Sequence, residues 1–282
     1  MTMSHLRHFF FLAGWVVIGL SACDLEQEVD IELPEYQSRL VVECYLEPGQ
    51  PFSLLLSRSL PYFDPFPPLN QEFLDNILVD SAQVEIFHDG KTYELSNQLS
   101  FNPLTSKVFN YYSLEKVPFD TLSSFELTVT LPDGHVVSGT TRILGAVPID
   151  SLVTQFADMD TLARVLTYFT DNPNEENYYR RMFHRSSLDS NAVQDFSIDD
   201  RILEGTAVFG TGYNYVAGDT IISTLFHIDR AYYEFLESLE DAVNANGNPF
   251  SQPSPIISNL SGNAIGIFTG ISYDRQAIIL RK

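Results

Sequence analysis

Cys23 stands in a sequence context that predicts covalent processing. Leu20, Ser21 and Ala22 precede it, so that a branched apolar residue and two small residues lead into the cysteine. Small residues let a cleavage enzyme close around the backbone, and the Cys23 sulfur is the nucleophilic atom that can accept a diacylglyceryl group. This is the pattern of a lipobox, which predicts cleavage after Ala22 and a lipid on Cys23.

Residues 1–22 carry the signal that such processing requires. Arg7 is present without any acidic residue, and an apolar run of about a dozen residues follows over 9–20. This run is shorter than the roughly 20 residues of a membrane-spanning helix, and Asp24 closes it. We predict a signal peptide over 1–22 and, by similarity to bacterial lipoproteins, a mature chain held in the membrane by acyl chains on Cys23. An ordinary signal peptide followed by a chance cysteine is the alternative.

Residues 23–37 form an acidic segment behind the cysteine. Acids occupy every second position from Asp24 to Glu32. Like charges repel and keep a chain extended, so we predict a solvated tether, although the alternation also fits a strand. The segment resembles the acidic export signals of surface lipoproteins from Bacteroidota. That resemblance implies an outer-membrane location that faces the cell exterior.

No residues in the sequence have the spacing of a metal site. The histidines of the mature chain are scattered singly, at His88, His135, His184 and His227. The stretch 171–176 offers oxygen ligands for Ca²⁺, but it lacks the glycine and the distant glutamate of an EF-hand, so a solvated turn is predicted. The sequence therefore predicts no metal site and no cofactor.

Catalytic patterns are equally weak. The residues 113–116 have Ser-x-x-Lys spacing without the helix start that this motif needs. Paired carboxylates of a glycosidase would suit so acidic a chain, but no spacing selects a pair. The tyrosines of 178–179 and 213–215 could stack on sugar rings, although packing within strands is the favoured interpretation. We predict a protein without a catalytic residue, and the ligand stays unknown.

Charge excludes one class of partner. The formal net charge is −21, and removal of residues 1–22 takes away Arg7 and no acid, which leaves −22. A surface this acidic repels phosphate backbones, so we expect no nucleic-acid binding.

Cys44 lies in an apolar run and has no partner cysteine once Cys23 is lipidated, so we predict a buried thiol.

Residues 38–145 predict an immunoglobulin-like β-sandwich. Short apolar runs alternate with turn residues, and Asp89-Gly90 is a strong hairpin signal because glycine tolerates a positive φ. The Pro- and aromatic-rich segment 60–68 must be a loop, either a binding lip or a loop packed by its own rings. The strands are expected at 40–46, 52–58, 82–88, 91–95, 108–112, 125–131 and 135–142.

Residues 146–282 predict a second β-rich domain with one helix near 229–245. Asp229 can cap the helix, and apolar residues from Tyr232 to Val243 form one stripe that should pack on the second sheet. Residues 246–249, Asn-Gly-Asn-Pro, should end it. Strands are expected at 151–156, 162–170, 177–184, 206–216, 221–228, 256–257, 264–271 and 276–281, the last three completing this domain.

Three passages together resemble the Bacteroidota family catalogued as domain of unknown function 4249. They are Leu40–Leu46 with 56–62, then 148–152 with 177–180, and finally 246–250 with 259–262 and 266–268. Cys44 departs from an expected glycine, and 263–265 alter the approach to Gly266. The resemblance lends no catalytic residue. It implies an outer-membrane location and a neighbourhood of TonB-dependent uptake receptors.

Together these features predict an outer-membrane surface lipoprotein, mainly β, that acts as a non-enzymatic binding or accessory component. Its membrane contact would be the lipid on Cys23, and a TonB-dependent receptor would be its partner. Two alternatives stay open. One is a surface hydrolase, a glycosidase or peptidase with dispersed carboxylates, and the other is a structural or adhesion protein of the envelope.

Overall fold

The computed structural model describes residues 37–60, 68, 70–102, 107–158, 161–202, 205–245 and 255–282. The predicted signal peptide, the lipobox with Cys23 and the acidic tether lie outside the described residues. So do residues 61–67 of the proline-rich segment and the Asn-Gly-Asn-Pro segment after the predicted helix. Ser38–Lys282 form one compact unit. Within the described ranges, no helix is long and apolar enough to cross a membrane.

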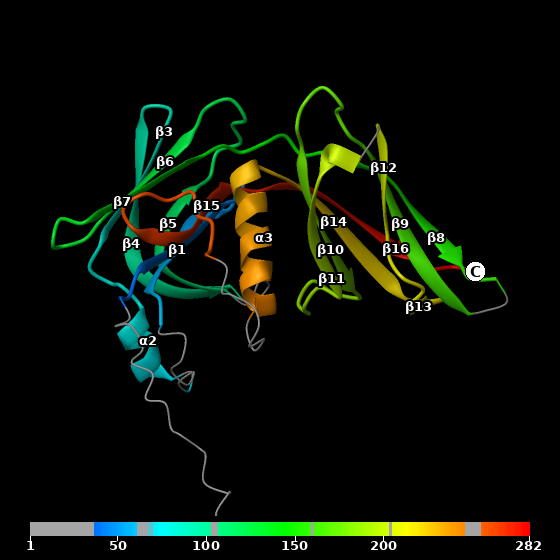
Figure 1. The fold of residues 1–282 in the computed structure, drawn as a ribbon, viewed down its shortest axis with the longest axis horizontal. Coiled ribbons are helices and arrows are strands. Elements are labelled where there is room, and N and C mark those ends of the chain that lie inside the picture. The colour runs from blue at the N-terminus through cyan, green and yellow to red at the C-terminus, as the bar shows by residue number, and fades with distance from the viewer. Residues whose placement is uncertain are drawn as a thin grey trace, which may run out of the picture. The chain divides into compact units, whose positions relative to one another are not determined.

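The first half of this unit is built on an eight-stranded sheet with the order β15-β1-β2-β5-β4-β3-β6-β7 (Figure 1). The N-terminal strands have the predicted positions, and two extend beyond them. Their bounds are β1 Leu40–Leu46, β2 Pro51–Arg58, β3 Gln83–His88, β4 Lys91–Asn102, β5 Lys107–Lys116, β6 Phe125–Thr130 and β7 Val136–Thr141. Strict alternation along β1 buries Leu40, Val42, Cys44 and Leu46 on one face. The predicted burial of Cys44 is confirmed, and burial raises the pKa of its thiol.

Strand β15 (Ala264–Gly270) belongs to the first sheet. It was expected to complete the second domain, but it lies parallel to β1 in the first sheet, with Gly266 opposite Val42. Phe268 joins the core of the first half. The backbone of β1 would otherwise present an unpaired edge, and β15 covers it. The boundary expected near residue 145 stays a prediction.

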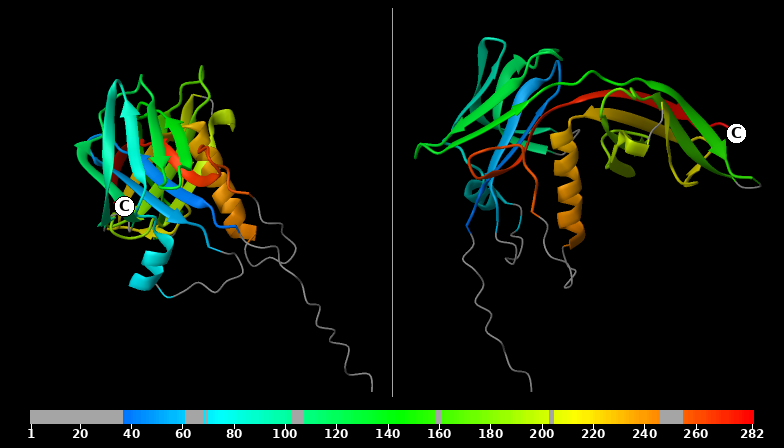
Figure 2. Two further views of the ribbon diagram at one scale, coloured as in Figure 1. Left: turned by 90° about the vertical axis from the view of Figure 1, so that its left-hand side faces the viewer. Right: turned by 45° about the horizontal axis from the view of Figure 1, so that its top comes forward.

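Beyond β15, the chain crosses into the second half. β16 (Ser272–Ile279) begins two residues after β15 ends and pairs with β14 (Thr220–Ile228). Figure 2 shows this segment, in red, running from the first group of strands into the second. One stretch of chain therefore hydrogen-bonds into two sheets.

The second half packs two small sheets against each other, so the predicted mainly β, sandwich-like fold is confirmed. One sheet has the order β11-β10-β14-β16, and the other places β9 between β12 and β13, with β8 also on β9. β11 was missed, and the strand expected over 206–216 is two strands with a break. The bounds are β8 Ile149–Phe156, β9 Leu162–Thr170, β10 Tyr178–Arg185, β11 Gln194–Asp199, β12 Thr206–Gly210 and β13 Tyr215–Val216.

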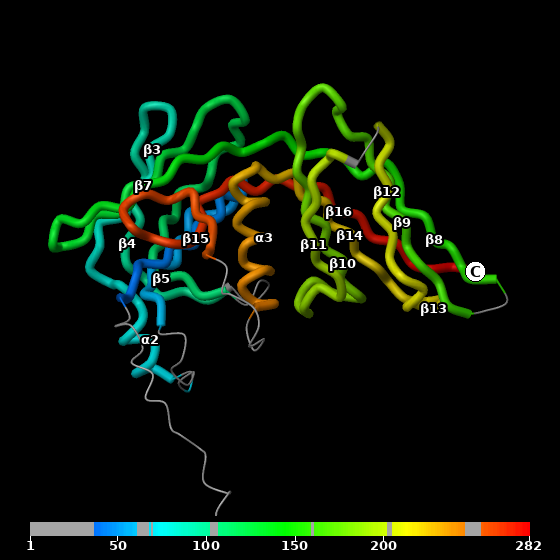
Figure 3. The backbone as a smooth tube through the Cα atoms, in the orientation of Figure 1, coloured from blue at the N-terminus to red at the C-terminus, as the bar shows by residue number. Residues whose placement is uncertain are grey.

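Helix α3 (Arg230–Ala245) has the predicted position and cap. Asp229 Oδ1 accepts a hydrogen bond from the Tyr232 amide at 2.7 Å. The packing differs from the prediction, because Tyr232 and Phe235 are buried against both halves whereas Val243 is 64% exposed. In Figures 1 and 3, α3 stands between the first sheet and the β10–β11–β14 sheet. The helix thus joins the two halves rather than covering one.

A second, short helix was not predicted from the sequence. α2 (Gln71–Ile77) begins at Asn70, whose side-chain oxygen accepts a hydrogen bond from the Phe73 amide at 2.8 Å. Only Phe73 is buried in it. A helix of seven residues with one buried side chain is too short to give a clear periodic pattern.

Gly266 generates the first prediction. Its φ is +119°, and a Cβ built on it would lie 1.9 Å from the Val42 carbonyl oxygen. Gly266→Ala should therefore lower the free energy of unfolding by more than about 3 kcal/mol, because β15 must leave β1 or strain the backbone. Urea unfolding followed by circular dichroism measures the change.

Two matched controls separate the causes. Gly90→Ala adds a Cβ in open space at φ +77° and should cost about 1–2 kcal/mol from conformation alone. Gly145→Ala meets nothing within 4 Å and should change stability by less than about 0.5 kcal/mol. A Gly266→Ala protein as stable as the Gly90→Ala protein would contradict the proposed contact.

Candidate functional site

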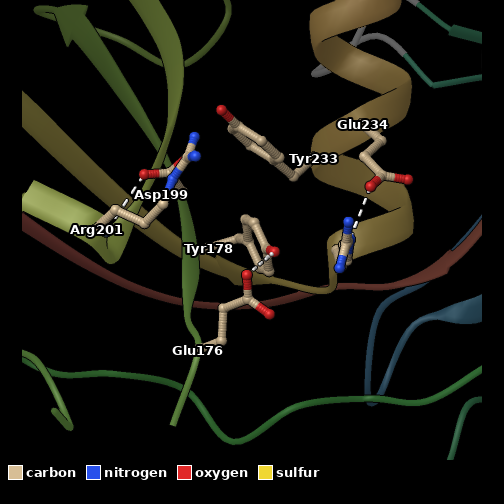
Figure 4. Close-up of a pocket in the computed structure, with 7 residues that line it drawn as sticks. Glu176, Tyr178, Asp199, Arg201, Tyr233 and Glu234 are labelled. Carbon is tan, nitrogen blue, oxygen red and sulfur yellow. Dashed lines mark hydrogen bonds and ion pairs between the residues drawn. The ribbon is translucent and has the colours of Figure 1, made fainter.

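A pocket of about 200 Å³ opens where β10 and β11 face the first turns of α3. Its walls come from two separate stretches of chain, as Figure 4 shows. Residues around β10, β11 and the short 3₁₀ helix at 200–202 provide one wall, and α3 provides the other. The lining residues are Glu176, Tyr178, Asp199, Arg201, Arg230, Tyr233 and Glu234.

Two tyrosines form the apolar part of the pocket. The rings of Tyr178 and Tyr233 lie 4.9 Å apart between centroids at an interplanar angle of 33°. Tyr178 is buried, and its hydroxyl donates a 2.7 Å hydrogen bond to Glu176. Burial and this carboxylate raise the pKa of Tyr178 to about 12. The tyrosine is therefore a neutral donor held in place by Glu176.

The charges of the pocket are arranged in pairs. Arg201 binds Asp199 through Nε at 2.7 Å, and Arg230 binds Glu234 at 2.7 Å across one helical turn. The arginine side chains of these pairs keep 77% and 67% of their surface exposed, so each pair contributes at most about 1 kcal/mol to stability. The bonds from Arg201 hold the pKa of the Asp199 carboxyl below its usual range.

Hydrogen bonds hold every carboxylate of the pocket. Three carboxylates line the pocket, and a glycosidase needs two, but each of the three already accepts a hydrogen bond from an arginine or a tyrosine. A general acid needs a raised carboxyl pKa, and that of Asp199 is lowered. The volume also falls below the roughly 300 Å³ of common ligand pockets. The pocket can hold a small polar group or one side chain of a partner.

Of the residues singled out in the sequence, Glu176 from the stretch 171–176 and Tyr178 line this pocket, and the other described ones do not. Tyr179 and Tyr215 are buried in the core, in line with the packing interpretation. Across the described residues, no group of three or more His, Cys, Asp and Glu could hold a metal ion. Ser113 and Lys116 both lie in β5, which gives the Ser-x-x-Lys spacing no helix start.

The segment 171–176 is a solvated turn only in part. Residues 172–176 are exposed, as expected, but Asp171 is 2% exposed. It accepts hydrogen bonds from the Tyr179 hydroxyl at 2.6 Å and the Asn177 amide at 3.2 Å. Asp171 therefore anchors the turn to the core, which corrects the reading of the whole stretch as solvated.

Five pocket residues, Tyr233 among them, were not foreseen as site residues from the sequence. Asp199 and Arg201 are two positions apart, and Arg230 and Glu234 have the i, i+4 spacing of a helical ion pair. These local signals indicate ion pairs but not a shared site. The pocket depends on α3 lying beside β10 and β11, which no local pattern reveals.

Comparison with known proteins gives a family and no activity. Residues 26–277 match the family described as "Domain of unknown function (DUF4249)". No curated protein matches the chain. Among solved structures, "Cytokine receptor complex - Crystal form 1A" is similar with a TM-score of 0.28 and 10% identity, over 68% of this chain and 86% of that one. Similarity at that level carries no argument about this protein.

The Tyr178–Glu176 bond generates the second prediction. Glu176→Gln should lower the pKa of Tyr178 from about 12, because a negative charge is lost, yet leave it above its usual value of about 10, because burial is the larger cause. Titration of ¹³Cζ-labelled tyrosine by NMR measures it, with Tyr178→Phe to assign the signal. Glu175→Gln, a neighbouring exposed acid, is the control and should leave the pKa unchanged.

The sign of the accompanying stability effect follows from linkage. The folded-state pKa of Tyr178 lies above the unfolded value of about 10. Its contribution to stability is therefore full below about pH 10 and is lost as the pH rises toward 12. Glu176→Gln should narrow the pH range over which this stability is lost, because it lowers the folded-state pKa of Tyr178. An unchanged Tyr178 pKa in this variant would contradict the assigned bond.

Proposed function

Because the chain belongs to the family described as "Domain of unknown function (DUF4249)", for which no activity is given, we propose its function from its own residues. The protein is a lipid-anchored component of the bacterial outer-membrane surface that binds a ligand or partner without catalysing a reaction. The lipobox at Leu20–Cys23 is the observation that carries this proposal. Small residues before the cysteine, an apolar run of the right length and acids after it agree with one another.

The body supports a binding role through its pocket. The carboxylates of Glu176, Asp199 and Glu234 are all engaged by neighbouring side chains, so the pocket offers hydrogen bonds and a tyrosine pair rather than an acid–base couple. The partner we favour is a TonB-dependent outer-membrane receptor, in line with the family resemblance. In this role the protein captures or presents a ligand to the transporter.

The tether is compatible with such a partner. The described chain begins at Gln37, so 13 residues, 24–36, lie between it and Cys23. Fully extended, this segment spans at most about 50 Å. A body on so short a tether stays within reach of other proteins in the same membrane, which raises its effective concentration there.

Lipid attachment gives the third prediction. Cys23→Ala should abolish incorporation of an alkyne fatty acid and move the protein from the membrane fraction to the soluble fraction, because the acylated sulfur is absent. Cys44→Ala is the matched control and should stay labelled, since the buried Cys44 thiol has no access to the lipid-transfer enzyme. In-gel fluorescence of cells grown with the alkyne fatty acid measures both. Equal labelling of the two variants would contradict the assignment of the lipobox.

The accessory role gives the fourth prediction. A membrane-impermeant cross-linker added to intact cells should link the wild-type protein to a TonB-dependent receptor, and mass spectrometry of the purified adduct identifies it. The Cys23→Ala variant should lose this adduct, because it is no longer held at the surface. Repeated purification from solubilised membranes without any transporter would count against the accessory role while leaving the lipid anchor intact.

A further inference from the structure

Arg181 is a charged side chain enclosed in the core of the second half. It lies on β10, and only 1% of its surface is exposed. Its neighbours along the strand point to the opposite face because side chains alternate. Arg181 therefore faces the β9–β12 sheet, whereas Arg180 faces α3, where it binds Tyr232.

Aromatic rings surround the Arg181 guanidinium. Its Cζ lies over Phe183 at 4.0 Å, over Phe196 at 4.3 Å and over Phe209 at 5.7 Å from the ring centroids. These rings belong to two separate apolar clusters, so the arginine stands between them. Elsewhere in the same half, the hydroxyls of Thr167 and Ser223, 3.0 Å apart, bridge the two sheets.

The hydrogen-bonding capacity of Arg181 is mostly unused. Nη2 donates to Gln194 Oε1 at 2.7 Å, but Nε and Nη1 are buried and have no partner among the described residues. These two atoms carry three of the five N–H donors. Desolvation lowers the pKa of Arg181 to about 10, so the group is still charged at neutral pH. Cation–π contacts offset part of the burial, but a buried charge without a counter-ion is still destabilising.

The adjacent Arg180 shows what a completed site looks like in this fold. Its Nε and Nη2 donate to the two carboxylate oxygens of Asp195 at 2.8 and 2.6 Å. Asp195 and Gln194 are consecutive residues of β11. The same strand therefore supplies a carboxylate to one arginine and only a neutral amide to the other.

The unpaired donors lie one strand inside an edge of the sandwich. β11 is the edge strand of one sheet and β12 is the edge strand of the other. Arg181 is one strand inside β11, directly opposite Phe196, which meets Phe209 of β12 edge to face at 5.5 Å. Gln194 on β11 is half-buried. A small molecule that moves Gln194 and parts this pair of rings reaches the guanidinium.

We propose that Arg181 binds a small carboxylate that enters between β11 and β12. A carboxylate is planar and accepts paired N–H bonds from a guanidinium, and it supplies the missing negative charge in a site that excludes water. The aromatic walls favour a compact acid, either free or at the end of a peptide. This inference goes beyond the proposed function and does not depend on lipid attachment.

Thermal unfolding of the whole chain, purified in detergent, tests the site. Sodium acetate should replace sodium chloride at constant ionic strength, and N-acetylglycine, with its amide as control, tests the peptide-end source. At about ten times the Kd, either carboxylate should raise the wild-type Tm by roughly 3 to 6 °C. A response to acetate alone assigns a free acid, and a larger response to N-acetylglycine assigns a peptide end.

Three variants make the result specific. Arg181→Met should unfold at or above the wild-type Tm without carboxylate and should not respond to it, because the uncompensated charge is gone. Gln194→Glu places a carboxylate beside Nη2 and should raise the Tm while abolishing the response. Arg164→Met removes a partly exposed arginine of β9, which binds Gln155, and should respond like the wild type.

The proposal fails if the wild-type Tm is the same in acetate, N-acetylglycine and chloride, which would mean that water or nothing satisfies the buried donors. It also fails if Gln194→Glu, which keeps the arginine and the strand intact, responds to carboxylate as strongly as the wild type does. Gln194→Glu therefore decides the question even where Arg181→Met does not fold.

Discussion

The close backbone contact between Gly266 and Val42 is the constraint on which the arrangement of this protein depends. A Cβ at position 266 would sit 1.9 Å from the Val42 carbonyl oxygen, so only glycine lets β15 run beside β1. Gly262, just before β15, and Gly270, its last residue, meet the same condition against the backbone of Val136, which begins β7, and of Arg142, which follows it. Three glycines four residues apart thus let β15 fit between β1 and β7.

The position of β15 also constrains the second half. One residue separates β15 from β16, and β16 pairs with β14 along its length. The pairing of β15 with β1 therefore limits where β16, and with it the sheet of the second half, can lie. Helix α3 completes the link, because Tyr232 contacts Tyr45 of β1 and binds Arg180 of β10. Asp229, which caps the helix, also accepts a hydrogen bond from Thr141 at the end of β7. The pocket between α3 and the β10–β11 edge follows from these contacts.

Two consecutive arginines of β10 have different surroundings because side chains alternate between the two faces of a strand. Arg180, on the α3 face, has a carboxylate and a phenol as partners, and these contacts tie β10 to β11 and the helix. Arg181, on the inner face, has one amide. Evolution toward stability alone would favour an apolar residue there, since a buried unpaired charge is costly. The presence of a cation with unused donors in an aromatic core is the physical basis for assigning it a ligand.

The sequence by itself determined the features that depend on local order. The lipobox, the alternation that buries Cys44, the Asp-Gly hairpin and the Asp229 cap each need only a few neighbouring residues, and the last three are seen in the structure. Only the tertiary structure decided the partners of β15, the two-sided packing of α3, the pocket and the isolation of Arg181. Each of these joins residues far apart in the chain, and strand pairing is set by hydrogen bonds that any backbone can make. Which edge a strand joins therefore leaves no periodic trace in the sequence.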